Sequence, residues 1–192
     1  ASFLERLRRE HVKAHPYGEP TYWDERYENN RREHGQLYSF DWYVDPDKIS
    51  SVLGLHCGEH LGAKILVLGC GNSKLSKVMY DMGYHSITSI DCSTVVISQM
   101  QYRYKDFEGM EFAVGDAMKL DAYPDNSFDC IIEKGCIDTI FCSYNCIDNA
   151  LAAYSECCRL LKPGTGKLIS VTYGNVETRV AHMRLNKWSE VE

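Results

Sequence analysis

The sequence predicts an α/β fold, a doubly wound and mostly parallel sheet with helices on both faces. Four short apolar runs, at 65–68, 86–91, 110–116 and 128–135, each end at or next to a glycine or an acidic residue. Stretches with helical periodicity separate most of these runs, and a fifth strand is expected at 166–173. Strands that alternate with helices favour a parallel sheet, which binds its ligands at the carboxyl ends of the strands.

Composition and charge set the limits within which this fold is interpreted. The chain has 192 residues, of which 44% are hydrophobic and 25% charged, as is typical of one soluble globular domain. Its net charge is -6, and residues 1–34 hold seven basic and seven acidic residues, so the remainder holds twenty acidic against fourteen basic residues. Such a surface argues against nucleic acid as a partner and favours a basic protein or a small molecule.

The nine cysteines are expected to be free thiols. Their odd number, the adjacent pair Cys157 and Cys158 and the lack of a recognisable signal peptide indicate a reducing compartment, so we expect a cytoplasmic protein. The irregular spacing of Cys136, Cys142 and Cys146 does not favour a zinc site, and no metal is expected. No apolar run approaches the roughly 18 residues of a membrane-spanning helix, so no membrane association is expected.

Residues 1–45 are expected to form an N-terminal helical arm, followed by the core domain at 46–192. Residues 3–13 have the apolar spacing of a short surface helix. After two prolines, Thr21 can cap a second helix that ends at Gly35.

Aromatic residues distinguish this second helix and the stretch that follows it. Trp23 and Tyr27 are four residues apart and therefore share one face of an otherwise polar helix. They could anchor the helix to the core, or they could cover a bound ligand together with Trp42. The second alternative would make residues 1–45 a lid.

The core begins with a helix that Asp45 and Asp47 open, and the central strand at 65–68 follows. A turn comes next, made of Gly69, Cys70, Gly71, Asn72 and Ser73. Its two glycines allow a sharp bend and the close approach of a ligand, and Asn72 or Ser73 can cap the next helix. This is the geometry of a nucleotide site, although a tight turn without a ligand is the alternative for a lone Gly-x-Gly.

The elements after this turn continue the alternation. Helices are expected at 74–83, 93–107 and about 147–161, and the last of these leads through the turn 162–164 into the strand at 166–173. Right-handed crossovers between parallel strands would place these helices on the two faces of one sheet.

Polar residues at the strand ends predict what the site binds. Asp91 lies 22 residues after Gly69 and can accept hydrogen bonds from both hydroxyls of a ribose. Asp116 can accept a hydrogen bond from the exocyclic amine of adenine, while the Ala117 amide donates to a ring nitrogen. A dinucleotide would require a third glycine where this chain has Lys74, which argues against a dehydrogenase.

Five segments together resemble the class I, seven-strand S-adenosylmethionine-dependent methyltransferases. They are GCGNS at 69–73, SIDCS at 89–93, GDAM at 115–118, FDCIIEKG at 128–135 and LLKPGTGKLI at 160–169. YWDERY at 22–27 and IEKGCIDTI at 132–140 are similar to the eukaryotic members that methylate lysines or the amino terminus of translation elongation factor 1-alpha. The family has a small or hydroxylated residue in place of Cys136, and its final hairpin would begin near 187–192, so the last strands are expected to be missing from this chain.

The resemblance implies S-adenosylmethionine as cofactor and S-adenosylhomocysteine as product. The cofactor contacts that it implies are Trp23, Tyr27, Trp42, Gly69, Cys70, Gly71, Asn72, Asp91, Cys92, Asp116, Ala117 and Lys134. It further implies a protein-lysine methyltransferase that acts on elongation factor 1-alpha or a related protein. A small-molecule methyltransferase and a non-catalytic scaffold that binds the cofactor are the alternatives.

Two acidic residues are candidates for removing a proton from the acceptor lysine, whose ordinary pKa is near 10.4. They are Glu133 and Asp138, the acids nearest to the end of the fourth strand. Each also has a structural alternative, because Glu133 could orient Lys134 and Asp138 could cap a helical turn.

Overall fold

The computed structural model describes residues 15–57, 61–186 and 188. The predicted helix at 3–13 and the expected start of a last strand near 187–192 therefore fall outside the described residues, apart from Trp188.

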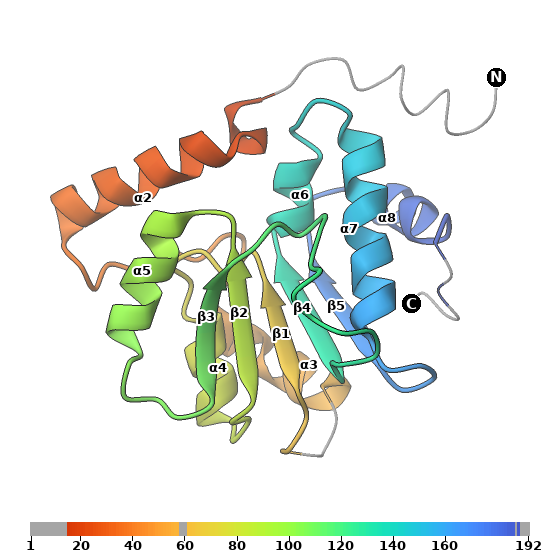
Figure 1. The fold of residues 1–192 in the computed structure, drawn as a ribbon, viewed down its shortest axis with the longest axis horizontal. Coiled ribbons are helices and arrows are strands. Elements are labelled where there is room, and N and C mark those ends of the chain that lie inside the picture. Colours follow the sequence, from red (N-terminus) through yellow and green to blue (C-terminus); the bar gives the residue numbers. More distant parts are fainter. Residues whose placement is uncertain (1–14, 58–60, 187, 189–192) are drawn as a thin grey trace.

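The described strands form one parallel sheet in the order β3-β2-β1-β4-β5 (Figure 1). They are β1 (Ile65–Leu68), β2 (Ile87–Asp91), β3 (Met110–Val114), β4 (Cys130–Lys134) and β5 (Lys167–Val171). Ile65 at the start of β1 pairs with Ile87 of β2 on one side and with Cys130 of β4 on the other. The strand order therefore reverses beside β1, where open α/β sheets bind their ligands. This arrangement confirms the predicted α/β class.

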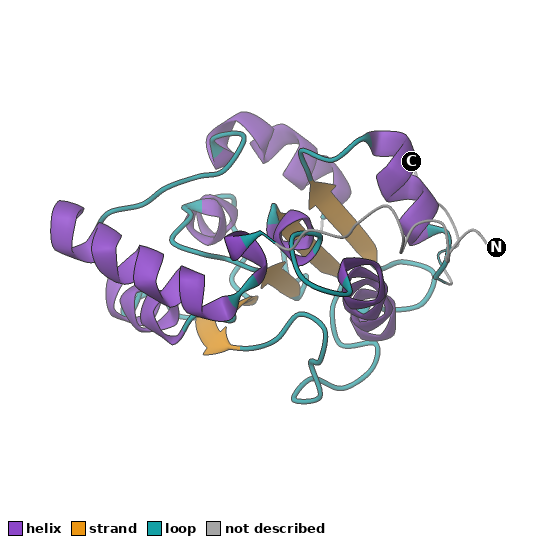
Figure 2. Ribbon diagram, turned by 90° about the horizontal axis from the view of Figure 1, so that it is seen from above, coloured by secondary structure: helices purple, strands orange, loops and turns teal. Residues whose placement is uncertain are grey.

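Helices cover both faces of the sheet (Figure 2). They are η1 (Pro16–Gly18), α2 (Pro20–His34), η2 (Pro46–Ile49), α3 (Ser50–His56), α4 (Leu75–Asp81), α5 (Thr94–Arg103), α6 (Cys136–Ile140), α7 (Cys146–Leu160) and α8 (Val176–Met183). β1 supplies side chains to both faces, because successive residues of a strand point to opposite sides. Ile65 and Val67 pack with α3, α4 and α5, whereas Leu66 and Leu68 pack with α7.

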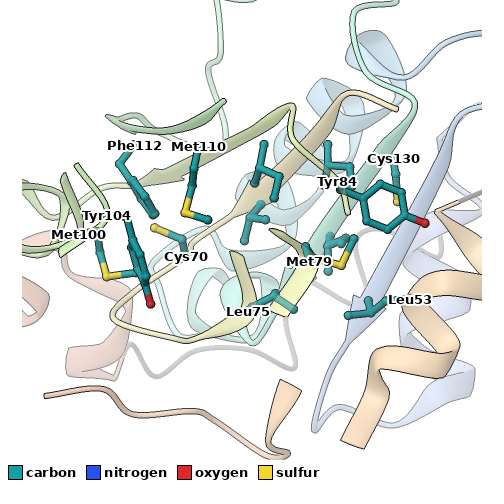
Figure 3. Packing of buried hydrophobic residues seen from close by; sticks show 14 of the residues in the cluster. Leu53, Cys70, Leu75, Met79, Tyr84, Met100, Tyr104, Met110, Phe112 and Cys130 are labelled. Carbon is teal, nitrogen blue, oxygen red and sulfur yellow. The ribbon is translucent and has the colours of Figure 1, made fainter. Parts of the chain in front are cut away.

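The largest hydrophobic cluster of the described residues lies on the side of α3, α4 and α5 (Figure 3). Leu53, Met79 and Met100, one from each of these helices, are fully buried there. Trp23 and Tyr27 of α2 belong to the same cluster, so α2 is part of the core.

Three details of the helices differ from the prediction. α2 begins at Pro20 and not after Thr21. Proline suits the first helical position, because an N–H at that position would have no partner within the helix. The N-cap of α4 is Lys74 and has no side-chain cap, so the prediction that Asn72 or Ser73 caps this helix is wrong. The Ser73 hydroxyl accepts a hydrogen bond from the Leu75 amide from one position further out, and Asn72 bonds elsewhere. α6 and α8 were not predicted; each is short, and the start of α8 was missed although Asn175 caps it by accepting a hydrogen bond from the Thr178 amide.

All nine cysteines are free thiols. Within the part of the chain that the structure describes, no helix is long and apolar enough to cross a membrane. The same residues contain no group of three or more His, Cys, Asp or Glu that could hold a metal ion.

Candidate active site

A cavity of about 400 Å³ opens at the carboxyl ends of the strands. The ends of β1, β2, β3 and β4 form its floor, and α2 with the aromatic loop at 38–44 forms its cover. All twelve cofactor contacts predicted from the sequence line this one cavity, namely Trp23, Tyr27, Trp42, Gly69, Cys70, Gly71, Asn72, Asp91, Cys92, Asp116, Ala117 and Lys134. Because the strand order is β3-β2-β1-β4, Asp116, Asp91, Gly69 and Lys134 follow one another along a single edge of the sheet.

The glycine turn after β1 depends on both of its glycines. Gly69 and Gly71 have φ values of 63° and 50°, in the left-handed region that favours glycine. A Cβ at Gly71 would lie 2.7 Å from the Tyr27 hydroxyl oxygen, so a side chain at this position would displace the Tyr27 ring. The Gly71 amide donates to Asp91 Oδ2 over 2.9 Å.

Asp91 is 7% exposed and is held by two main-chain donors. Its Oδ1 accepts from the Ser93 amide over 2.9 Å, in addition to the bond from Gly71 to Oδ2. Burial raises the pKa of Asp91, and the two amide hydrogen bonds oppose this shift. Each carboxylate oxygen has a second lone pair, so Asp91 can still accept hydrogen bonds from a ligand in the cavity.

The first half of α2 is held by hydrogen bonds that involve three of its residues. The Trp23 indole N–H donates to the Tyr17 carbonyl over 2.9 Å, and Gln99 Nε2 donates to the Tyr27 carbonyl over 3.3 Å. Between these bonds, Asp24 accepts from the Ser93 hydroxyl over 2.6 Å. Trp23 and Tyr27 are only 8% and 6% exposed, so the same aromatic face both packs in the core and walls the cavity.

The aromatic loop at 38–44 is held by polar side chains of the core. Arg103 of α5 donates to the carbonyls of Tyr38, Gln36 and Asn72, with the shortest bond, 2.5 Å, to Tyr38. Asn72 also contacts this loop, because its Oδ1 accepts from the Phe40 amide over 3.3 Å. Neither contact was predicted from the sequence, where Arg103 belongs to no motif.

Lys134 ends β4 with its side chain only 4% exposed. Its ammonium lies 3.1 Å from the Asp41 carboxylate and donates to the Trp42 carbonyl over 3.0 Å. Lys134 therefore ties the aromatic loop to the floor of the cavity. Both oxygen partners of its ammonium belong to this loop.

Asp116 and Ala117 lie at the end of the cavity formed by β3. Asp116 is exposed, and its Oδ1 accepts from the Met118 amide over 2.9 Å. This bond shapes the turn that presents the Ala117 backbone to the cavity. Cys92, exposed beside Asp91, lines the same region.

Glu133 is not among the described residues that line the cavity. It is fully buried, where its carboxylate accepts from the Ile137 amide over 3.1 Å and from the Ser170 hydroxyl. Burial raises its pKa to about 7, against the effect of these two hydrogen bonds. Among the described residues, Glu133 and Lys134 make no hydrogen bond to each other, because adjacent residues of a strand point to opposite faces of the sheet.

Asp138, in the first turn of α6, is likewise absent from the described cavity lining. It lies 2.7 Å from the Arg179 guanidinium, and it accepts hydrogen bonds from Thr172, the Tyr173 amide and the Tyr43 hydroxyl. Burial alone would raise the pKa of Asp138, but these four donors outweigh burial and lower it.

Several cavity residues were missed by the sequence analysis. Among them are Tyr17, Gly18, Phe40, Met118, Thr139, Ser143 and Asn149. Phe40 belongs to the aromatic stretch before the core and could have been included on that ground. Met118 and Thr139 lie in the segments 115–118 and 132–140 that carry the family resemblance, whereas the remaining four belong to no such segment.

A family model described as a methyltransferase domain matches residues 59–190. The chain belongs to the methyltransferase domain family. The match confirms the resemblance seen in the sequence and makes this protein a methyltransferase, with its glycine turn and strand-end acids inside the matched region.

Individual relatives agree with the family. This methyltransferase is 32% identical over 188 residues to the mouse protein named EEF1A lysine methyltransferase 4, an alignment that covers 92% of this chain and 69% of that one. It is 34% identical over 125 residues to the bovine eEF1A lysine and N-terminal methyltransferase, covering 65% of this chain and 17% of that protein. The chain thus spans about a sixth of this second relative.

A solved structure of another protein has a similar fold. The cyclase SpnF matches this methyltransferase with a TM-score of 0.67 at 19% identity, over 91% of this chain and 74% of that one. At this identity the match supports the architecture and not the activity.

Proposed function

We propose that this methyltransferase binds S-adenosylmethionine in the cavity and transfers its methyl group to a lysine of elongation factor 1-alpha or a related translation protein. The observation that carries the cofactor assignment is the convergence of twelve predicted contacts, from segments between residues 23 and 134, on one cavity. The acceptor assignment is supported by the names of two relatives that are 32% and 34% identical.

The residues around the cavity fit the chemical parts of this cofactor. Asp91 keeps free lone pairs for two ribose hydroxyls, and Asp116 with Ala117 provides an acceptor and a donor for the adenine edge. The rings of Trp23 and Trp42 lie near one another, with centroids 6.3 Å apart, and could attract a cationic sulfonium.

When bound, the cofactor supplies an activated methyl group that a nucleophile can displace in line. The protein then mainly has to hold the acceptor amine in line with that group and to exclude water. Such positioning can lower a barrier by about 7 to 11 kcal/mol. The aromatic cover formed by Trp23, Tyr27 and Trp42 provides the exclusion, which is the lid role proposed for residues 1–45.

The acceptor lysine must lose a proton, because only the neutral amine is a nucleophile. Burial in an apolar channel lowers the pKa of a lysine and assists this step. Glu133 and Asp138 already accept bonds from several internal donors and lie outside the described cavity lining. We therefore propose that both organise the end of β4 and that neither takes the proton directly.

The proposed setting is the cytoplasm, which the nine free thiols support. The residues beyond 34 carry the acidic excess, which suits a basic protein partner.

The test is transfer of a labelled methyl group from S-adenosylmethionine to purified elongation factor 1-alpha, followed by amino-acid analysis. The proposal expects label in methyl-lysine, and expects Asp91→Asn to reduce the labelling. Label that appears only in small molecules of a cell lysate would favour the small-molecule alternative. Binding of S-adenosylhomocysteine without transfer to any acceptor would favour the scaffold.

A further inference from the structure

Tyr43 adopts a backbone conformation that is unfavourable for a bulky residue. Its φ is 65°, and the Val44 amide donates to the Trp42 carbonyl over 2.7 Å, which closes a tight γ-turn around it. Two further bonds hold this turn in place. Lys134 donates to the same Trp42 carbonyl, and the Tyr43 hydroxyl donates to Asp138 Oδ2 over 2.8 Å.

The turn separates two neighbouring rings. Trp42 lines the cavity, whereas Tyr43 is not among the described residues that do so. The Tyr43 ring instead lies outside, against the glycine that follows β4. A Cβ built on Gly135 would lie 3.2 Å from Tyr43 Cε2, and Gly135 itself lines the cavity. Tyr43 therefore borders the cavity at the end of β4.

A second tyrosine extends this border. Tyr173, just after β5, stacks on Tyr43 with ring centroids 6.1 Å apart and an interplanar angle of 26°. The two side chains are 47% and 87% exposed, yet Asp138 holds both, through the hydroxyl of Tyr43 and the main-chain amide of Tyr173. Exposed tyrosine rings that stack on one another are typical of binding surfaces.

We propose that the Tyr43–Tyr173 pair binds the cationic side chain of the acceptor lysine where it enters the cavity. This inference rests on the proposed function. The faces of tyrosine rings attract an ammonium group, and their apolar surface suits the methylene stem of a lysine. Within the described residues, Arg179 and Lys134 each lie within 4 Å of an aspartate, so neither cation is left to compete for the rings.

Tyr173→Ala is the cleanest test, because it removes a ring and leaves the main-chain bond to Asp138 in place. Tyr173→Phe keeps the ring, and Tyr102→Ala removes a tyrosine of α5 that is 61% exposed and serves as a matched control. Each variant is assayed for S-adenosylhomocysteine affinity by calorimetry, and for KM and kcat with purified elongation factor 1-alpha. Direct binding of this protein to the enzyme loaded with S-adenosylhomocysteine is measured in parallel.

The inference expects Tyr173→Ala to raise KM and the dissociation constant of the protein substrate roughly two- to tenfold. It expects kcat and S-adenosylhomocysteine affinity to stay at wild-type values, Tyr173→Phe to restore KM, and Tyr102→Ala to have no effect. Tyr43→Ala should act in the same direction. A wild-type KM in Tyr173→Ala, or an equal loss of cofactor affinity, would overturn the inference and leave the proposed function standing.

A wild-type enzyme that does not methylate elongation factor 1-alpha would contradict the proposed function instead. The same variants are then compared by labelling of protein lysines in a whole-cell lysate. Reduced lysine labelling by Tyr173→Ala supports the tyrosine pair whatever the labelled protein is. The proposal is overturned if Tyr173→Ala labels lysines as well as the wild-type enzyme does, or if the wild-type enzyme labels no lysine.

Discussion

A carboxylate oxygen of Asp91 lies 2.9 Å from the amide nitrogen of Gly71, so the acid at the end of β2 also holds the glycine turn at the end of β1. The other oxygen bonds to the Ser93 amide at the start of α5. One side chain thus links the neighbouring strand ends that form the middle of the cavity floor.

Asp91→Ala should weaken S-adenosylhomocysteine binding by several-fold to about a hundredfold. Hydrogen bonds to a charged group contribute about 1.5 to 3 kcal/mol, and the variant also releases the glycine turn. Calorimetry measures the affinity, and circular dichroism checks the fold. Asp106→Ala, at an exposed position before β3, is the control. A folded Asp91→Ala protein with wild-type affinity would exclude the ribose contact.

S-adenosylhomocysteine should raise the melting temperature, and nicotinamide dinucleotides should leave it unchanged. A ligand that binds only the native state stabilises it by an amount that grows with the logarithm of the ratio of ligand concentration to dissociation constant. Lys74 stands where a dinucleotide site requires a third glycine. A thermal shift assay with both ligands at equal concentration decides the matter, and the reverse ranking would favour a dehydrogenase.

Amide exchange across residues 21–30 of α2 should slow when S-adenosylhomocysteine is added. Trp23 and Tyr27 wall the cavity from this helix, so a bound ligand gives the helix additional contacts. Asp24→Ala removes the 2.6 Å bond to Ser93 and should speed exchange in α2 and weaken ligand binding. Glu33→Ala, near the end of the same helix, is the control. Exchange that is slow and insensitive to ligand would make the aromatic residues core anchors only.

Arg103→Lys should loosen the aromatic loop and weaken S-adenosylhomocysteine binding. The guanidinium of Arg103 reaches three carbonyls of two segments, and a lysine ammonium lacks the planar fork needed to reach them together. Faster amide exchange at 36–42 would report the loosened loop. Arg32→Lys, whose side chain is 69% exposed, controls for the general effect of the substitution. Unchanged exchange and affinity would show that Asn72 and Lys134 hold the loop without Arg103.

Glu133 should make the protein less stable as the pH rises. Its pKa is about 7 in the folded protein against 4.5 for an ordinary glutamate, so between these values the folded state binds more protons than the unfolded state. The free energy of unfolding should therefore fall from about pH 4.5 through pH 7, by about 3 kcal/mol for this group.

Glu133→Gln should remove this fall, because the glutamine amide does not ionise. Urea unfolding at several pH values between 5 and 8 measures the difference between the variant and the wild type. The free energy of unfolding of the variant, relative to that of the wild type, should increase as the pH rises. Glu25→Gln removes one negative charge at an exposed position and controls for the general effect of that loss. Parallel curves for Glu133→Gln and the wild type would show that Glu133 stays ionised when buried.

Local patterns in the sequence determined the strands, the glycine turn and the acids at the strand ends. Short apolar runs and turn residues act over a few neighbours, so β1 and the turn at Gly69 could be predicted from their own residues. The positions of Asp91 and Asp116 followed, because parallel strands bring their carboxyl ends to one edge of the sheet. The family resemblance added the aromatic contacts.

Only the tertiary structure decided how the cover is fastened and where the remaining acids point. Asp24 meets Ser93 across 69 residues of sequence, and Lys134 reaches Trp42 across 92. Glu133 is buried away from the cavity, although it is adjacent to Lys134 in the chain. Contacts of this kind depend on how separate elements pack against one another, and the spacing of residues along a chain carries no direct record of that packing.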